Sequence, residues 1–263
     1  MSAITSHRGS PSQVTEAAQP VPASPLDAED LRARVDRALA AVLGQELSAL
    51  GFLGADAGLT DDRLAAALRV FNRLRSELMG GQYLDLVEAR RGAPDEDAVR
   101  RVLTYKSGKY TIERPLHLGH ALAAGAPALA GGYSAYGLPL GEAFQLRDDI
   151  LGVFGEPEVT GKPAGDDLRE GKETYLVLLA RQRADRAGRQ LLEAALGNAK
   201  LSEDEVAEVR RLLEACGALE ATEARIGELL AEAKAALAAT RGIDEQARAT
   251  LAALADHVTD RSA

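Results

Sequence analysis

Residues 144–172 bring together side chains that could bind a metal-bound phosphate group. The segment holds an amide, four aspartates and two lysines, namely Gln145, Asp148, Asp149, Lys162, Asp166, Asp167 and Lys172. Aspartates bind hard cations such as magnesium and usually leave several metal positions to water and phosphate oxygens. Lysines bind the same phosphates as point charges. The segment therefore predicts diphosphate chemistry.

The first three of these residues are spaced for a helix. Gln145, Asp148 and Asp149 lie at i, i+3 and i+4, so a helix would place them on one face. Their neighbours are mostly apolar, which indicates a helix buried around much of its circumference. Two adjacent like charges in such a helix cost free energy unless a cation or partner neutralises them. We therefore predict a metal site, and the alternative is a solvated polar face.

Two further segments carry weaker signals. Lys162 and Lys172 flank an aspartate pair in a stretch rich in glycine, which favours a shaped lid over the alternative of a charged surface loop. Lys106 precedes the hydroxyl of Ser107 in a short basic segment. This pair could hold a phosphate, and the alternative is an ordinary surface lysine.

Composition favours an all-α fold for the 263 residues. Apolar residues make up 46% of the chain, much of this is alanine, and there is no tryptophan. Strand-forming residues never cluster in alternating runs. The net charge of −9 and the lack of a basic stripe argue against nucleic-acid binding. No apolar run is long enough to span a membrane and no signal peptide is visible, so we expect a cytoplasmic protein.

We expect residues 1–26 to be a disordered tail, because they lack apolar periodicity, and residues 27–263 to form one helical domain. The first predicted helix begins near Asp27, and the second, after Thr60, has a break or kink at Gly80-Gly81. Further helices are predicted at 95–106, 107–123, 132–154, 172–196, 203–239 with a break at Gly217, and 244–259. The loop 155–170 is long enough to suggest a functional role.

Taken in order, these segments resemble the trans-isoprenyl diphosphate synthases, the family that includes farnesyl and geranylgeranyl diphosphate synthases. The matching segments are Glu77-Leu-Met-Gly-Gly-Gln82-Tyr-Leu-Asp85, Tyr105-Lys106-Ser107-Gly108-Lys109-Tyr110, Phe144-Gln145-x-x-Asp148-Asp149 and Thr160-Gly-Lys162-Pro-x-x-Asp-Asp167 with Glu170-Gly171-Lys172. The stretch from Phe144 to Lys172 is the most specific part of this resemblance.

The resemblance implies a helical bundle around a central cavity, in which Mg²⁺ holds an allylic diphosphate that condenses with isopentenyl diphosphate. By resemblance, Asp148 and Asp149 bind magnesium, Lys106 and Lys162 hold the allylic diphosphate, and Lys172 closes the site. Gln145 and Ser107 would face the leaving group and the allylic cation. We expect the helices bearing Gln82 and Gln145 to pack side by side, with Lys106 pointing into the same space.

The chain departs from the family pattern at three points. Gly152 stands where the second aspartate-rich motif often has a third aspartate. The first aspartate-rich motif is absent, because Asp61-Asp62 is not followed by the further carboxylate. The basic loop that binds isopentenyl diphosphate in the family is also absent. An internal loss that joins an early helix to a later one accounts for both absences, so we expect a bundle that is incomplete on its N-terminal side.

Three functions are compatible with these observations. The first is a trans-prenyltransferase of isoprenoid biosynthesis, and the second is an inactive structural or regulatory subunit of an intact homologue. The third is a class I terpene cyclase, although Glu170 and Thr174 stand where a cyclase motif has Ser and Glu. Helices lost from a bundle leave apolar faces without partners, so we expect a homodimer or a heteromer with an intact homologue.

Overall fold

The computed structural model of the chain describes residues 60–91, 94–156 and 164–259. No strand occurs in these ranges, which confirms the all-α prediction. The helices are α2 (Asp61–Arg91), α3 (Glu96–Val102), the π-helical η1 (Leu103–Glu113), α4 (Arg114–Leu122), α5 (Ala128–Phe154), α7 (Asp166–Glu170), α8 (Tyr175–Arg183), α9 (Arg186–Ala195), α10 (Glu203–Ala215), α11 (Ala218–Ala239) and α12 (Glu245–Thr259). The predicted tail, the predicted helix from Asp27 and Lys162 lie outside the described residues.

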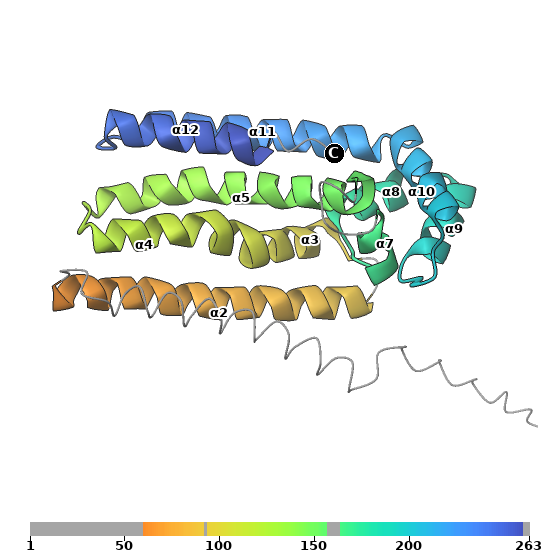
Figure 1. Ribbon diagram of the computed structural model, residues 1–263, viewed down its shortest axis with the longest axis horizontal. Coiled ribbons are helices and arrows are strands. Elements are labelled where there is room, and N and C mark those ends of the chain that lie inside the picture. Colours follow the sequence, from red (N-terminus) through yellow and green to blue (C-terminus); the bar gives the residue numbers. More distant parts are fainter. Residues whose placement is uncertain (1–59, 92–93, 157–163, 260–263) are drawn as a thin grey trace, which may run out of the picture.

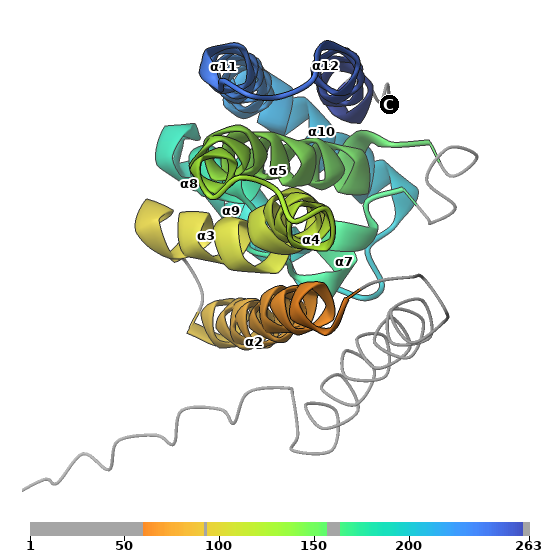
Figure 2. The ribbon, with the colours of Figure 1, turned by 90° about the vertical axis from the view of Figure 1, so that its left-hand side faces the viewer.

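The long helices lie in layers, with α5 in the middle (Figure 1). α11 and α12 cover one side of α5, η1 and α4 cover the other side, and α2 packs on the far side of these two (Figure 2). The short helices α7 to α10 gather at one end of the bundle. Among the described helices, none is both long and apolar enough to cross a membrane.

Apolar burial explains the central position of α5. Three clusters of buried side chains make up the core, and α5 contributes to each of them. Its buried apolar residues, none more than 2% exposed, are Tyr136, Leu140, Ala143, Leu146, Ile150 and Val153. Burial of one large apolar side chain stabilises a fold by about 1.5–3 kcal/mol, so this helix carries much of the hydrophobic stabilisation.

Most of the predicted helices are present, although several of them begin or end at other residues than predicted. The predicted break at Gly217 is confirmed, since this residue has a φ of 72° between α10 and α11. The single helix expected over 172–196 is two helices. Ala184 leaves the helical conformation, and the side chain of Asp185 caps α9 by accepting a hydrogen bond of 2.7 Å from the backbone N–H of Gly188.

Helix α2 continues through Gly80 and Gly81, so the predicted break or kink does not end the helix there. Gly81 instead lets α2 approach η1 closely: a Cβ there would lie 2.5 Å from the backbone nitrogen of Lys106. On the opposite side of η1, a Cβ at Gly141 of α5 would overlap the Cα of Gly108. Two adjacent glycines favoured a break or kink, but Gly81 brings two backbones together, whereas a Cβ at Gly80 would meet no atom within 4 Å.

The segment η1 therefore lies between α2 and α5, and it separates two helices that we expected to be neighbours. Helix α2, which bears Gln82, and helix α5, which bears Gln145, are not among the described helix pairs that share extensive contacts.

The boundary predicted between Lys106 and Ser107 is also wrong, since η1 runs continuously through both residues. π-Helical turns often occur at functional sites, and this one carries two of the predicted site residues.

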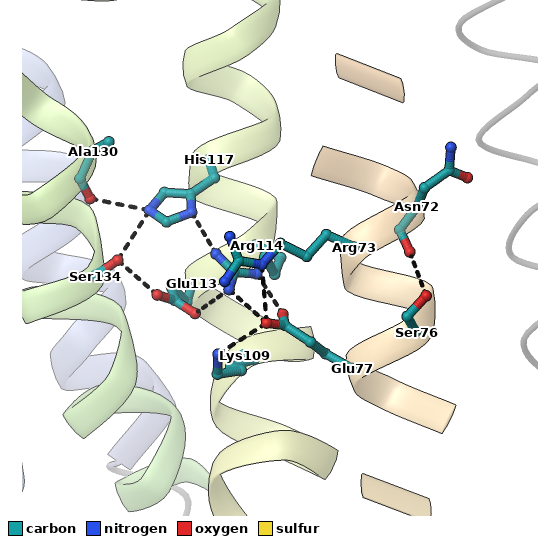
Figure 3. A network of polar contacts seen from close by, with 10 residues as sticks. All are labelled: Asn72, Arg73, Ser76, Glu77, Lys109, Glu113, Arg114, His117, Ala130 and Ser134. Carbon is teal, nitrogen blue, oxygen red and sulfur yellow. Dashed lines mark hydrogen bonds and ion pairs between the residues drawn. The ribbon is translucent and has the colours of Figure 1, made fainter. Parts of the chain in front are cut away.

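A polar network links these layers away from the apolar clusters (Figure 3). Glu77 of α2 accepts hydrogen bonds from Arg114 Nε at 2.6 Å and from Lys109 Nζ at 3.0 Å. Ser134 of α5 donates to Glu113 at 2.6 Å. Burial alone would raise the pKa of Glu77, but the hydrogen bonds and charges of Arg114 and Lys109 lower it to about 2. The network therefore holds an ionised carboxylate between α2 and α4.

Substitution of Gly81 by Ala should destabilise the fold, because the new methyl group meets the η1 backbone. We expect a loss of about 1–3 kcal/mol in the free energy of unfolding, measured by urea denaturation. Gly80→Ala is the matched control, since no atom lies within 4 Å of a Cβ at that position. The control should be neutral or stabilising by up to ~1 kcal/mol. Equal effects of the two substitutions would argue against close packing of α2 on η1.

Substitution of Glu77 by Gln should cost about 3 kcal/mol at neutral pH, because it removes the partner of a buried arginine. The folded-state pKa of about 2 is well below the usual glutamate pKa of 4.5. The contribution is therefore complete above pH 4.5 and is lost as the pH falls toward 2. Urea unfolding at neutral pH and at pH ~3 should show the difference between wild type and variant shrinking in acid. Glu208→Gln, at an exposed position of α10, should show no such change.

Candidate active site

One cavity brings four of the predicted site residues together. It lies where α2, α3, η1 and α5 meet the turn between α7 and α8. Its lining residues are Asp85, Val99, Val102, Leu103, Lys106, Gln145, Asp149, Lys172, Glu173 and Thr174. The cavity has a volume of about 60 Å³, which is space for a few water molecules.

Helix α5 contributes an amide and a buried carboxylate to this cavity. Gln145 Nε2 donates a hydrogen bond of 3.0 Å to Asp149 Oδ1, and Asp149 is only 6% exposed. Burial raises the pKa of Asp149 to about 7, and the nearby charge of Asp167 adds to this, whereas Gln145 and the lysines act in the opposite direction. Asp148 is half-buried and is not one of the residues that line the cavity. The two residues one turn apart thus share the cavity face, and Asp148 lies about 60° from Gln145 and about 100° from Asp149 around the helix axis.

The segment η1 contributes Lys106, whose ammonium group is held by a carboxylate of α2. Lys106 Nζ donates to Asp85 Oδ2 at 2.6 Å, and both side chains remain partly exposed. Ser107 is buried and is not among the residues lining the cavity. In the sequence, Asp85 stands three residues after Gln82 in a segment that resembles the family. Its pairing with Lys106 depends on the packing of α2 against η1.

The turn after α7 contributes Lys172 on the far side of the cavity. Lys172 Nζ pairs with Asp167 Oδ1 and also lies 3.2 Å from Glu170 Oε2. Burial alone would lower the pKa of Lys172, but these two carboxylates raise it, so the lysine stays charged. Thr174, which also lines the cavity, caps α8 by accepting a hydrogen bond from the backbone N–H of Val177.

The carboxylates at the cavity fit a hard cation whose remaining ligands are water and phosphate oxygens. Within the described ranges, no group of three or more His, Cys, Asp or Glu side chains is arranged to hold a metal ion. Magnesium is commonly held by one or two protein carboxylates, with water and phosphate oxygens completing its shell. Burial and the nearby Asp167 disfavour the negative charge of Asp149, and a bound cation would stabilise that charge. These residues therefore fit magnesium that arrives together with a phosphate group.

The charges in the cavity also indicate which anion could bind there together with a cation. Each lysine ammonium is held by an aspartate, Lys106 by Asp85 and Lys172 by Asp167, so the two positive groups are already oriented. A diphosphate with several negative charges competes well for such groups, because its oxygens can bind both lysines and a cation together. The arrangement is thus suited to a metal-bound diphosphate.

Comparison with known proteins agrees with this geometry. The polyprenyl synthetase family profile matches residues 33–213. The chain is 36% identical over 214 residues to a (2E,6E)-farnesyl diphosphate synthase of Mycobacterium bovis, covering 76% of this chain and 56% of that protein. It is 30% identical over 204 residues to a geranylfarnesyl diphosphate synthase of Aeropyrum pernix, covering 78% of this chain and 63% of the relative.

A solved structure has the same fold. The geranylgeranyl pyrophosphate synthase of Corynebacterium glutamicum, crystallised with isoprenyl diphosphate and magnesium, aligns with a TM-score of 0.75 and 40% identity. The alignment covers 79% of this chain and 58% of that one, so the chain spans less than two thirds of the length of these relatives. With the family profile matched over most of its length, the chain belongs to the polyprenyl synthetase family.

Proposed function

We propose that the chain forms the second-motif half of a trans-prenyltransferase site, which acts on an allylic diphosphate and isopentenyl diphosphate in isoprenoid biosynthesis. One observation carries the proposal: Lys106, Gln145, Asp149 and Lys172, from separate parts of the chain, line one cavity. The names of its relatives, which are farnesyl and geranylfarnesyl diphosphate synthases, support the substrate class. We expect the protein to act in the cytoplasm.

The residues of this chain can perform specific steps of such a reaction. Lys106 and Lys172 bind the diphosphate oxygens and stabilise the negative charge that builds up as the diphosphate departs. Gln145 holds the buried carboxylate of Asp149 in place through its hydrogen bond. Asp148 and Asp149 would hold magnesium, which supplies further charge stabilisation for the leaving group. Ser107 and Lys162 are assigned to the leaving group and the allylic diphosphate by the family pattern alone.

The missing first motif limits what this chain can do by itself. Asp61-Asp62 opens α2 and is not followed by the further carboxylate that the motif needs. Ionisation of the allylic substrate uses cations on both sides of its diphosphate, and one side has no aspartate-rich motif here. Loss of one electrostatic contact of this kind costs about a hundredfold to a thousandfold in rate. We therefore propose weak diphosphate binding and negligible condensation by the isolated chain.

A direct assay tests this function. The chain is incubated with magnesium, isopentenyl diphosphate and an allylic diphosphate, and the products are separated by chain length. We expect little or no longer diphosphate from the unmodified chain, and clear turnover after the missing segment is inserted from an intact homologue. In the restored protein, Asp148→Ala should lower the rate by about a hundredfold or more. Robust turnover by the unmodified chain, or a hydrocarbon product, would contradict the proposal.

We also propose that the chain forms a homodimer through an apolar patch on α2 and η1. The patch consists of Met79, Tyr83 and Tyr105, which are 48%, 68% and 37% exposed. Tyr83 and Tyr105 line an open groove of about 460 Å³ together with Gly80 and Leu84, and the polar side chains of Arg73, Ser76 and Glu77 line it as well. Exposed aromatic and methionine side chains are enriched at protein interfaces, and a continuous patch of them is unusual on a monomer.

Sedimentation velocity tests this assembly. Wild type should sediment as a dimer, and Tyr83→Asp should shift it to the monomer because a charge is placed in the centre of the patch. Leu254→Asp is the matched control, since Leu254 is a 40% exposed apolar residue on α12, far from α2. A well-behaved wild-type monomer would contradict the proposal, as would association only with an intact homologue.

A further inference from the structure

Gly152 lies on α5 at a point where the chain has no room for a side chain. A Cβ at this position would overlap the carboxylate of Asp167, with its Oδ1 only 3.0 Å away. Gly152 follows Asp149 by one helical turn, so the Asp167 carboxylate occupies the space next to the buried carboxylate of the cavity. The charge of Asp167 contributes to the raised pKa of Asp149, which is consistent with this proximity.

Helix α7, which carries Asp167, is held firmly in this place. Leu168 is 1% exposed, and its carbonyl oxygen accepts a hydrogen bond of 2.8 Å from the backbone N–H of Gly197. Arg169 donates from Nε to the carbonyl oxygen of Leu201 at 3.0 Å and pairs with Glu203 at 2.9 Å. Because the backbone of α7 is fixed, a side chain at position 152 would displace the carboxylate of Asp167 and leave the helix in place.

The carboxylate of Asp167 has a function at the cavity. It pairs with Lys172 Nζ, and its side chain is only 9% exposed, whereas that of Lys172 is 35% exposed and lines the cavity. The backbone N–H of Lys172 also donates to the carbonyl oxygen of Asp167 at 3.0 Å. Asp167 thus orients the one cavity lysine contributed by the α7–α8 turn.

We infer that Gly152 is a positioning residue: its missing side chain admits the Asp167 carboxylate, which in turn holds Lys172 at the diphosphate site. The inference rests on the proposed function. The position where related motifs often carry a third aspartate is thereby already filled by a carboxylate from α7. A third aspartate at 152 would place two carboxylates in one buried space, which costs free energy through repulsion and desolvation.

The binding of inorganic pyrophosphate in the presence of magnesium chloride, measured by titration calorimetry, tests the inference. Gly152→Ala should weaken binding by about tenfold to a hundredfold, because Lys172 loses Asp167 as a partner and is left with Glu170, 3.2 Å away. Gly152→Asp should weaken it at least as much, although it restores the third carboxylate. Gly131→Ala is the matched control on the same helix, since no atom lies within 4 Å of a Cβ there, and it should leave binding unchanged.

A Lys172→Ala background distinguishes a positioning role of Gly152 from a general loss of structure. In a Lys172→Ala protein, Gly152→Ala should have no further effect on pyrophosphate affinity, because the lysine through which it acts is gone. An undiminished effect in that background would overturn the inference, and so would tighter binding by Gly152→Asp.

If wild type binds no pyrophosphate, that result contradicts the proposed function. The inference about Gly152 can still be tested by measurements of unfolding. Gly152→Ala should lower the urea midpoint relative to Gly131→Ala, and this difference should shrink in an Asp167→Ala background, where the methyl group has space. A difference of the same size in both backgrounds would show that Gly152 does not act through Asp167.

Discussion

The site depends on the close approach of three backbones. The segment η1 lies between α2 and α5, and glycines on both neighbouring helices remove the side chains that would hold them apart. This packing sets the position of Lys106 relative to Asp85 on one side and to Gln145 and Asp149 on the other. Because the contact involves backbone atoms, small shifts cannot be absorbed by a change of rotamer.

The second constraint is the balance of charge around a buried carboxylate. Asp149 is surrounded by apolar core residues of α5, and the compensating positive charges come from η1 and from the α7–α8 turn. Each of those lysines has an aspartate partner of its own, and Glu170 also lies beside Lys172, so carboxylates outnumber lysines around the cavity. A bound cation would offset this negative charge.

The chain presents part of a family architecture, and it keeps two aspartates of the second motif, Asp148 and Asp149, with Gly152 at the position of the third. Helix α5 and the turn after α7 supply Gln145, Asp149 and Lys172 to the cavity, and their mutual geometry is built by α5, α7 and α8. Among the described residues that line the cavity, α2 contributes one carboxylate, Asp85, which is paired with Lys106. The proposed weakness in ionising an allylic diphosphate follows from this shortage of carboxylates on the α2 side.

The sequence by itself determined the fold class, most of the helices and the segments that carry the chemistry. These follow from local physics: apolar periodicity selects helices, and Gln145 and Asp149 share a face because one helical turn separates them. Sequence reasoning missed what depends on contacts between distant segments. It expected a break at Gly80-Gly81 and assigned no role to Gly152, and it did not pair Lys106 with Asp85. Only the tertiary structure decided these, because a glycine that breaks a helix and a glycine that admits a neighbour look identical until the neighbour is in place.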